Sequence, residues 1–403
     1  MRFKLYNSIG REEIYAANKV LKSGFLSKFV AGNFDGGHFV KKFEKYLAKF
    51  YKVKHAITLN SWTSGLIASV GALKINPGDE IITTPWSMCA SATAILHWNA
   101  IPIFVDIDKD SFCIDPKKIK EKITKKTVAI IAVDIFGRSS DYVEIKKVIK
   151  GTKIKLITDS AQSPYSFYKN KLTGTQSDIG GFSLNYHKHI NTGEGGVIVT
   201  NNDLLAKRVK MIRNHAEVFK KNRTNYQLSN MIGYNFRMGE IEAAIGIEQY
   251  KKLKRIILKR NLLINHLNKN LSKLKGLILP VLPKGSTHNY YVYPLVLDKE
   301  KISISRKIIV KNLKSLGVKG LMEGYSNIHL LPMYQKKIAY GEKGFPWSYF
   351  NNKVTYKKGI CPIAEEMHEK FFFGIEVCLF NLGKKEINFI INSFYKTWNK
   401  LKI

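Results

Sequence analysis

The sequence predicts an α/β fold: a large domain with a mostly parallel sheet, followed by a smaller α+β domain. Two observations support this fold class. Short β-branched runs alternate with amphipathic segments over about residues 54–200, and a long helical pattern over about residues 238–267 leads into a chain of different character. Strand followed by helix, repeated, predicts crossover connections and a sheet covered on both faces. We therefore expect a large domain over residues 1–254 and a small domain over residues 255–403.

The individual elements follow from the spacing of apolar residues. Short β-branched runs predict strands over residues 55–59, 80–84, 101–105, 128–133, 155–158 and 197–200. Helical spacing predicts helices over residues 63–73, 87–97, 115–123 and 140–149. The smaller domain is expected to hold a strand over 290–297 and helices over 303–317 and 386–398. Residues 324–359, rich in Tyr, Gly, Pro and Lys, indicate a long irregular region of a kind that is often functional.

Length and composition predict a globular protein of enzyme size, since 45% of the 403 residues are hydrophobic. No run approaches the roughly 18 apolar residues that cross a bilayer, and the first ten residues lack a signal-peptide pattern. We therefore expect a cytoplasmic protein without a membrane partner. The cysteines are far apart, without metal-ligand spacing, which predicts reduced thiols and no metal site. They are Cys89, Cys113, Cys361 and Cys378.

The formal charge of +35 does not by itself predict a nucleic-acid partner. Lysines are spread along the chain, as in residues 117–126, and no recognised nucleic-acid motif accompanies them. Such runs are typical of solvated helix faces. A positive field would still help to recruit a small anionic substrate.

Three segments carry candidate chemistry. Lys188 lies between two predicted strands and before a Gly-rich turn, where an amine can be sheltered and its pKa lowered; a lysine of this chain is otherwise expected at the surface. Asp159 ends an apolar strand, where an acid could keep the pyridinium nitrogen of a cofactor protonated or simply cap a helix. Residues 59–65 run from a strand end into a helix start with hydroxyls, which suits either a phosphate or ordinary capping.

Together these segments resemble the DegT/DnrJ/StrS family of sugar aminotransferases, which depend on pyridoxal 5'-phosphate (PLP) and have the type I aminotransferase fold. The matches occur in order and cover nearly the whole chain. They are residues 9–14, 60–66, 77–82, 102–108, 159–162, 182–196, 213–215, 233–238 and 240–246.

The resemblance implies two catalytic residues. Lys188 would bind the aldehyde of PLP and then carry a proton between substrate and cofactor, and Asp159 would pair with the ring nitrogen. Gln162 would lie near the phenolic oxygen. The flanking His187 and His189 would pack locally or contact the substrate.

The resemblance also implies a phosphate site shared by two subunits. Thr63 and Ser183, with the backbone amides of Trp62 and Thr63, would hold the phosphate. Asn235 would reach it from the partner subunit of a homodimer. Short hydroxyls and amides suit a dianionic phosphate because they orient it without bulk.

Two positions depart from the family pattern. Trp62 stands where the family commonly has Gly, so the loop has to make room for an indole. Met88 stands where an aromatic residue often stacks on the cofactor, and Trp86 is the competing candidate for that role.

The implied reaction is a transamination in which an amino-acid donor, L-glutamate by family analogy, supplies nitrogen to a keto group of a nucleotide-diphosphate deoxysugar for surface polysaccharide or glycan biosynthesis. Arg237 is the expected partner of the pyrophosphate, with an ion pair to Glu240 or Glu242 as the alternative. The nucleotide, the sugar, the aminated carbon and even a cyclitol acceptor stay open.

Two other functions are considered. A sister group carries histidine in place of the lysine and removes a sugar hydroxyl as a 3-dehydratase. Counting forward from Phe182 and back from residues 192–196 puts Lys188 at the reactive position, which favours the transaminase. A non-catalytic regulatory homologue is disfavoured by the intact set of Lys188, Asp159 and Gln162.

Overall fold

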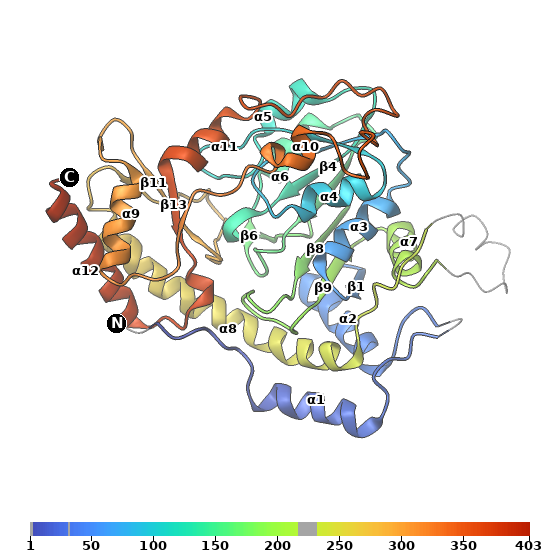
Figure 1. Ribbon diagram of the computed structural model, residues 1–403. Helices are drawn as coiled ribbons and strands as arrows, with labels where there is room; N and C mark the ends of the chain where they lie inside the picture. Colours follow the sequence, from blue (N-terminus) through green and yellow to red (C-terminus); the bar gives the residue numbers. More distant parts are fainter. Residues whose placement is uncertain (1–2, 31–32, 217–231) are drawn as a thin grey trace.

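A seven-stranded sheet forms the centre of the larger part of the molecule (Figure 1). The computed structural model describes residues 3–30, 33–216 and 232–403. Along the sheet the strands follow the order β1-β9-β8-β5-β4-β2-β3. Only β9 runs antiparallel to its neighbours in this sheet, so the predicted mostly parallel sheet is confirmed. The strands are β1 (His55–Leu59), β2 (Glu80–Thr83), β3 (Ile101–Phe104), β4 (Thr127–Val133), β5 (Lys155–Asp159), β8 (Ile179–Ser183) and β9 (Gly196–Thr200).

Helices cover both faces of this sheet because alternate strand residues point to opposite sides. In β4, Ala129 and Ile131 pack with one hydrophobic cluster, and Ile130 and Ala132 with another. The first cluster includes residues of α3 (Trp62–Ala72), α4 (Ala90–His97) and α7 (Asp203–Arg213). Shorter helices are α5 (Pro116–Ile119), which Asp115 caps ahead of a proline, and α6 (Tyr142–Val148).

Two helices near the N-terminus, not predicted from the sequence, pack against the long helix α8 (Glu240–Leu271). They are α1 (Arg11–Ser23) and α2 (His38–Tyr51). A buried ion pair joins α2 to the end of α7, since Arg213 donates to Glu44 and to the carbonyls of Thr58 and Phe34.

A second sheet, with the order β10-β11-β13-β12, lies beyond α8 and is antiparallel. Its strands are β10 (Leu277–Ile278), β11 (Tyr293–Leu297), β12 (Leu321–Glu323) and β13 (Phe372–Ile375), and α9 (Arg306–Ser315) and α12 (Lys384–Leu401) pack on it. The remaining elements are β6 (Phe167–Tyr168), β7 (Lys171–Leu172), α10 (Pro332–Gln335) and α11 (Pro362–Glu366). Helix α8 runs through the expected boundary at residues 254 and 255, which stays a prediction.

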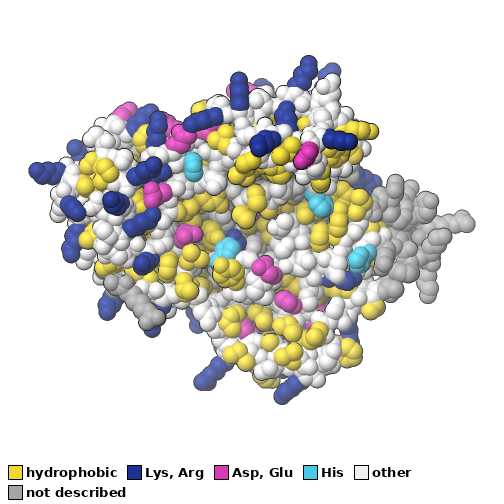
Figure 2. Space-filling model, viewed as in Figure 1, with side chains coloured by type: hydrophobic (Ala, Val, Ile, Leu, Met, Phe, Trp, Pro, Cys, Tyr) yellow, Lys and Arg dark blue, Asp and Glu magenta, His cyan; other side chains and the backbone are white. Residues whose placement is uncertain are grey.

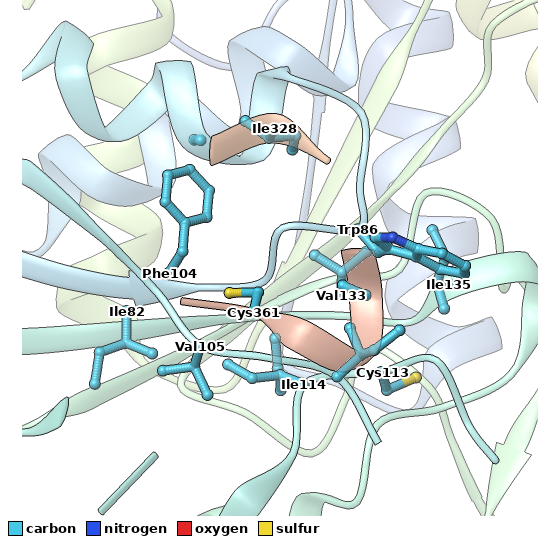
Figure 3. Packing of buried hydrophobic residues seen from close by; sticks show 14 of the residues in the cluster. Ile82, Trp86, Phe104, Val105, Cys113, Ile114, Val133, Ile135, Ile328 and Cys361 are labelled. Atoms are coloured by element: carbon cyan, nitrogen blue, oxygen red, sulfur yellow. The ribbon is translucent and has the colours of Figure 1, made fainter. Parts of the chain in front are cut away.

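The irregular region over residues 324–359 folds back onto the large sheet. Ile328 lies in the same buried cluster as Trp86, Phe104 and Val133 (Figure 3). Buried aromatic residues of this region anchor it to the core, which brings Tyr325 toward the carboxyl ends of the central strands. Among the described residues, no helix is long and apolar enough to cross a membrane.

Candidate active site

A cavity of about 220 Å³ opens at the carboxyl ends of the central strands β4, β5 and β8. This edge of an open α/β sheet is where ligands commonly bind. Eight of the residues predicted from the sequence line the cavity, and three do not. The eight are Trp62, Thr63, Met88, Asp159, Gln162, Ser183, His187 and Lys188.

Lys188 lies in the connection between β8 and β9 and is only 9% exposed. A turn from Asn185 holds its backbone, and its Nζ lies 4.4 Å from the centroid of the Tyr291 ring. Burial lowers the pKa of Lys188 to about 8 from its ordinary value of 10.5. A sizeable fraction of this amine is therefore neutral near physiological pH and can act as a nucleophile or a base.

Asp159 ends β5 and is 4% exposed. Its Oδ1 accepts hydrogen bonds from Trp62 Nε1 at 2.7 Å and from the Ala161 amide at 3.2 Å. Its Oδ2 accepts one from Ser91 Oγ at 2.6 Å. These donors give hydrogen bonds to both oxygens of the buried carboxyl group, and Lys188 lies close enough to interact with it electrostatically.

The start of α3 supplies a site suited to an anion. Ser61 caps the helix by accepting from the Ser64 amide, so the amides of Trp62 and Thr63 are left at the first turn without partners inside the helix. The Thr63 side chain is exposed toward the cavity, and the Ser183 hydroxyl lines it from the end of β8. Helix amides and hydroxyls gathered in this way can bind a phosphate.

Gln162 follows β5 and is held by its carbonyl, because Oε1 accepts from the Phe136 amide at 2.6 Å. Its NH₂ group is then left as a donor at the cavity. Tyr325 lies beside Gln162 and also lines the cavity, and burial raises the pKa of the Tyr325 hydroxyl to about 12. The hydroxyl is therefore a neutral donor.

The two candidates for stacking on a ring differ in position. Met88 lines the cavity and is 66% exposed. Trp86 is fully buried in the cluster of Figure 3, and its Nε1 donates to Asn327 Oδ1 at 2.9 Å. The structure thus brings Met88, and not Trp86, to the cavity.

The two histidines beside Lys188 also point to different places. His187 lines the cavity, and burial lowers its pKa to about 4, so its imidazole is neutral. His189 is fully buried and contacts Arg260 and Cys378, away from the cavity lining. Of the two predicted alternatives for His189, the structure fits local packing.

Asn235 and Arg237 lie outside the cavity of their own chain. The exposed Asn235 forms an isolated bridge with Asn214, and Arg237 Nη1 donates to Asn214 Oδ1 at 2.8 Å. The alternative partner Glu240 is engaged elsewhere, since its carboxylate accepts from the amides of Gly37, Phe39 and Val40.

Sequence reasoning missed several side chains of the site, and three of them matter most for its geometry. Tyr291 supports Lys188 but lay inside a run that predicted a strand, and Ser91 holds Asp159 from within an apolar helix pattern. Tyr325 belongs to the irregular region that had been expected to be functional. Two signals were available: Ser91 is a polar residue on the apolar face of a short helix, and Tyr325 lies in the region 324–359.

Comparison with known proteins agrees with this geometry. Residues 7–370 match the DegT/DnrJ/EryC1/StrS aminotransferase family. The chain is 32% identical to the spore coat polysaccharide biosynthesis protein SpsC of Bacillus subtilis, over 87% of this chain and 88% of SpsC. It is 31% identical to the GDP-perosamine synthase of Caulobacter vibrioides, over 74% and 79% of the two chains.

A solved structure shows the same fold. Helicobacter pylori PseC, an aminotransferase involved in the biosynthesis of pseudoaminic acid, superposes with a TM-score of 0.80 at 26% identity, covering 99% of this chain and 100% of PseC. The chain therefore belongs to the DegT/DnrJ/EryC1/StrS aminotransferase family, and it is a PLP-dependent enzyme with the type I aminotransferase fold.

Proposed function

We propose that this chain transfers an amino group from L-glutamate to a keto group of a nucleotide-activated deoxysugar for the synthesis of surface polysaccharide or glycan. The observation that carries the proposal is the buried amine of Lys188, with its lowered pKa, in one cavity with the carboxylate of Asp159. The names of the relatives support the sugar substrate, since they include a GDP-perosamine synthase and a polysaccharide biosynthesis protein.

The residues of the cavity fit PLP. Lys188 offers an amine for the aldehyde, Asp159 a carboxylate for the ring nitrogen, and Gln162 an NH₂ group for the phenolic oxygen. Thr63 and Ser183 offer hydroxyls for the phosphate, together with the amides at the start of α3. When bound, PLP supplies an aldehyde that takes up the amino group and a ring that accepts electron density from the substrate.

The protein's own part in the reaction centres on the Lys188 Nζ. Because the pKa of this group lies near 8, Nζ can accept a proton from the substrate carbon and later return it. Tyr291 packs under Nζ and restricts its position. The neutral imidazole of His187 is suited to hydrogen bonding with a sugar hydroxyl, and Arg237 is our candidate for the pyrophosphate.

We also propose a homodimer in which Asn235 reaches the phosphate of the partner subunit. Two observations support it. Asn235 is exposed and lies outside its own cavity, and apolar side chains gather on the outer face of α1 and just beyond it (Figure 2). The exposed apolar residues there are Ile14, Tyr15, Leu21, Phe25 and Leu26.

Complementation tests the shared site. Lys188→Ala and Asn235→Ala proteins, each inactive alone, should regain part of the activity when they are unfolded together and refolded as hybrids. A mixture that stays inactive although hybrids form, or a fully active monomer, would contradict it. We propose the cytoplasm as the compartment; four free cysteines, three of them buried, are in keeping with a reducing environment.

The reaction itself is tested with a panel of nucleotide keto-deoxysugars and ¹⁵N-labelled glutamate. The expected products are a ¹⁵N-amino sugar and 2-oxoglutarate in equal amounts. A deoxygenated sugar without the label would indicate the dehydratase instead. Failure of every substrate, in a protein that binds no PLP, would favour the regulatory homologue.

A further inference from the structure

The indole of Trp62 occupies an unusual place for a residue at the start of a helix. Trp62 is the first residue of α3, yet it is only 5% exposed. Its side chain does not fill the loop. It turns toward the sheet, where Nε1 donates to Asp159 Oδ1 at 2.7 Å.

Two glycines make the room for this indole. A Cβ on Gly65, one helical turn along α3, would lie 2.5 Å from Trp62 Cε3. A Cβ on Gly181 would lie 2.0 Å from Trp62 Cζ3. Gly181 is also the residue paired with Asp159 between β5 and β8, so the slot for the indole opens beside the carboxylate.

The hydrogen bonds on Asp159 define which of its oxygens remains available. A carboxylate accepts about four hydrogen bonds, roughly two at each oxygen. Oδ1 already has two donors, the Trp62 indole and the Ala161 amide, whereas Oδ2 has one, Ser91. The vacant acceptor position is therefore on Oδ2.

We propose that Trp62 is a positioning residue, which saturates Asp159 Oδ1 and so directs Oδ2 toward the ring nitrogen of the cofactor. This inference rests on the proposed role of Asp159. A purely structural indole would only fill the slot, and its N–H would make no difference to the cofactor.

The test compares two forms of the cofactor. Trp62→Phe keeps an aromatic ring in the slot and removes the N–H; a second variant with benzothienylalanine at position 62 keeps the bicyclic shape and also lacks the N–H. Each is titrated by equilibrium dialysis with PLP and with the PLP analogue whose ring nitrogen is replaced by carbon. The melting temperature of the cofactor-free protein is measured alongside.

Loss of one hydrogen bond to a charged group predicts that the Kd for PLP rises about tenfold in both variants. The Kd for the carbon analogue should stay within about twofold of wild type, because that ring does not use Asp159. An equal loss for both ligands, or no loss for PLP, would overturn the positioning role.

Two controls separate this inference from the proposed function. If wild-type protein binds PLP no better than the carbon analogue, the role of Asp159 itself fails. Gly65→Ala tests the slot, because the three atoms nearest to its added Cβ all belong to the indole. It should weaken PLP binding in wild type and have no effect in a Trp62→Ala background, and a loss in both backgrounds would contradict the slot.

Discussion

Asp159→Asn removes the negative charge of Asp159 from the candidate site and keeps a side chain of nearly the same shape. The asparagine can keep the hydrogen bonds to its carbonyl oxygen from Trp62 Nε1 and Ala161 N, which now meet Oδ1 of the carboxylate. Its NH₂ group would face Ser91 Oγ, and that hydroxyl can turn to accept while donating to Ser87 Oγ, 2.6 Å away. We therefore expect a small change in the free energy of unfolding.

Catalysis should suffer much more. Removal of one preorganised electrostatic partner costs about 3 kcal/mol of transition-state stabilisation, which corresponds to a fall in kcat of about 150-fold. The assay is single-turnover conversion of the PLP-loaded enzyme with saturating glutamate, followed by absorbance. A single-turnover rate constant within about threefold of wild type would refute the assignment of Asp159 to the ring nitrogen.

Asp134→Asn is the matched control, since Asp134 follows β4 beside Asp159 but lies outside the cavity lining. Its buried carboxylate accepts from Ser140 N, Ser160 Oγ and Tyr142 Oη, and an amide cannot accept from all of them. This variant should lose about 1–3 kcal/mol of stability and keep its affinity for PLP. If both variants lose stability and activity alike, the loss of activity at Asp159 is structural.

Three further predictions concern charge. Lys188→Met should raise the free energy of unfolding of the cofactor-free protein by about 3 kcal/mol below pH 8, because folding lowers the pKa of this amine from 10.5 to about 8. The gain in stability should shrink as the pH rises from 8 to 10.5, where the folded wild-type amine is already neutral. A gain that does not depend on pH in denaturant titrations would exclude this cause. Arg213→Leu should cost about 3–5 kcal/mol in the same titrations, because it leaves the buried Glu44 carboxylate without its cation; an unchanged midpoint would argue against the pair. Arg237→Ala should raise KM for the nucleotide sugar and leave the glutamate half-reaction unchanged, whereas equal damage to both half-reactions would make this arginine structural.

Local sequence patterns were sufficient to predict six of the seven strands of the large sheet, and the central strand β8 was missed. Buried strands such as 128–133 are continuous apolar runs, and the predicted helices 63–73, 87–97, 115–123 and 140–149 lie where the structure has helical segments. Helices α1, α2 and α7 were missed. In α2 the buried residues Val40, Phe43 and Leu47 stand at helical spacing and were an overlooked local signal. The packing partner of α1 and α2, helix α8, lies more than 180 residues away in the sequence and could not be read locally.

Sequence patterns were most informative for site residues that lie at or just after the end of a strand. Asp159, Ser183 and Lys188 meet because β5 and β8 are parallel neighbours; the sequence placed Asp159 at a strand end, whereas the pairing with β8 came only from the structure. Tyr291 and Tyr325 come from the C-terminal part of the chain, whose docking onto the large sheet depends on tertiary packing. The direction of the Trp62 indole could not be predicted either, because the room for it depends on Gly181, a glycine in the distant strand β8.

The central claim is that Lys188 is the lysine that holds PLP. Borohydride reduction of the purified, PLP-loaded protein, followed by proteolysis and mass spectrometry, tests it most directly. We predict one phosphopyridoxyl label, on the peptide containing Lys188, and its absence from Lys188→Ala protein. A label on any other lysine, or an unlabelled protein that nevertheless transaminates, would contradict the account.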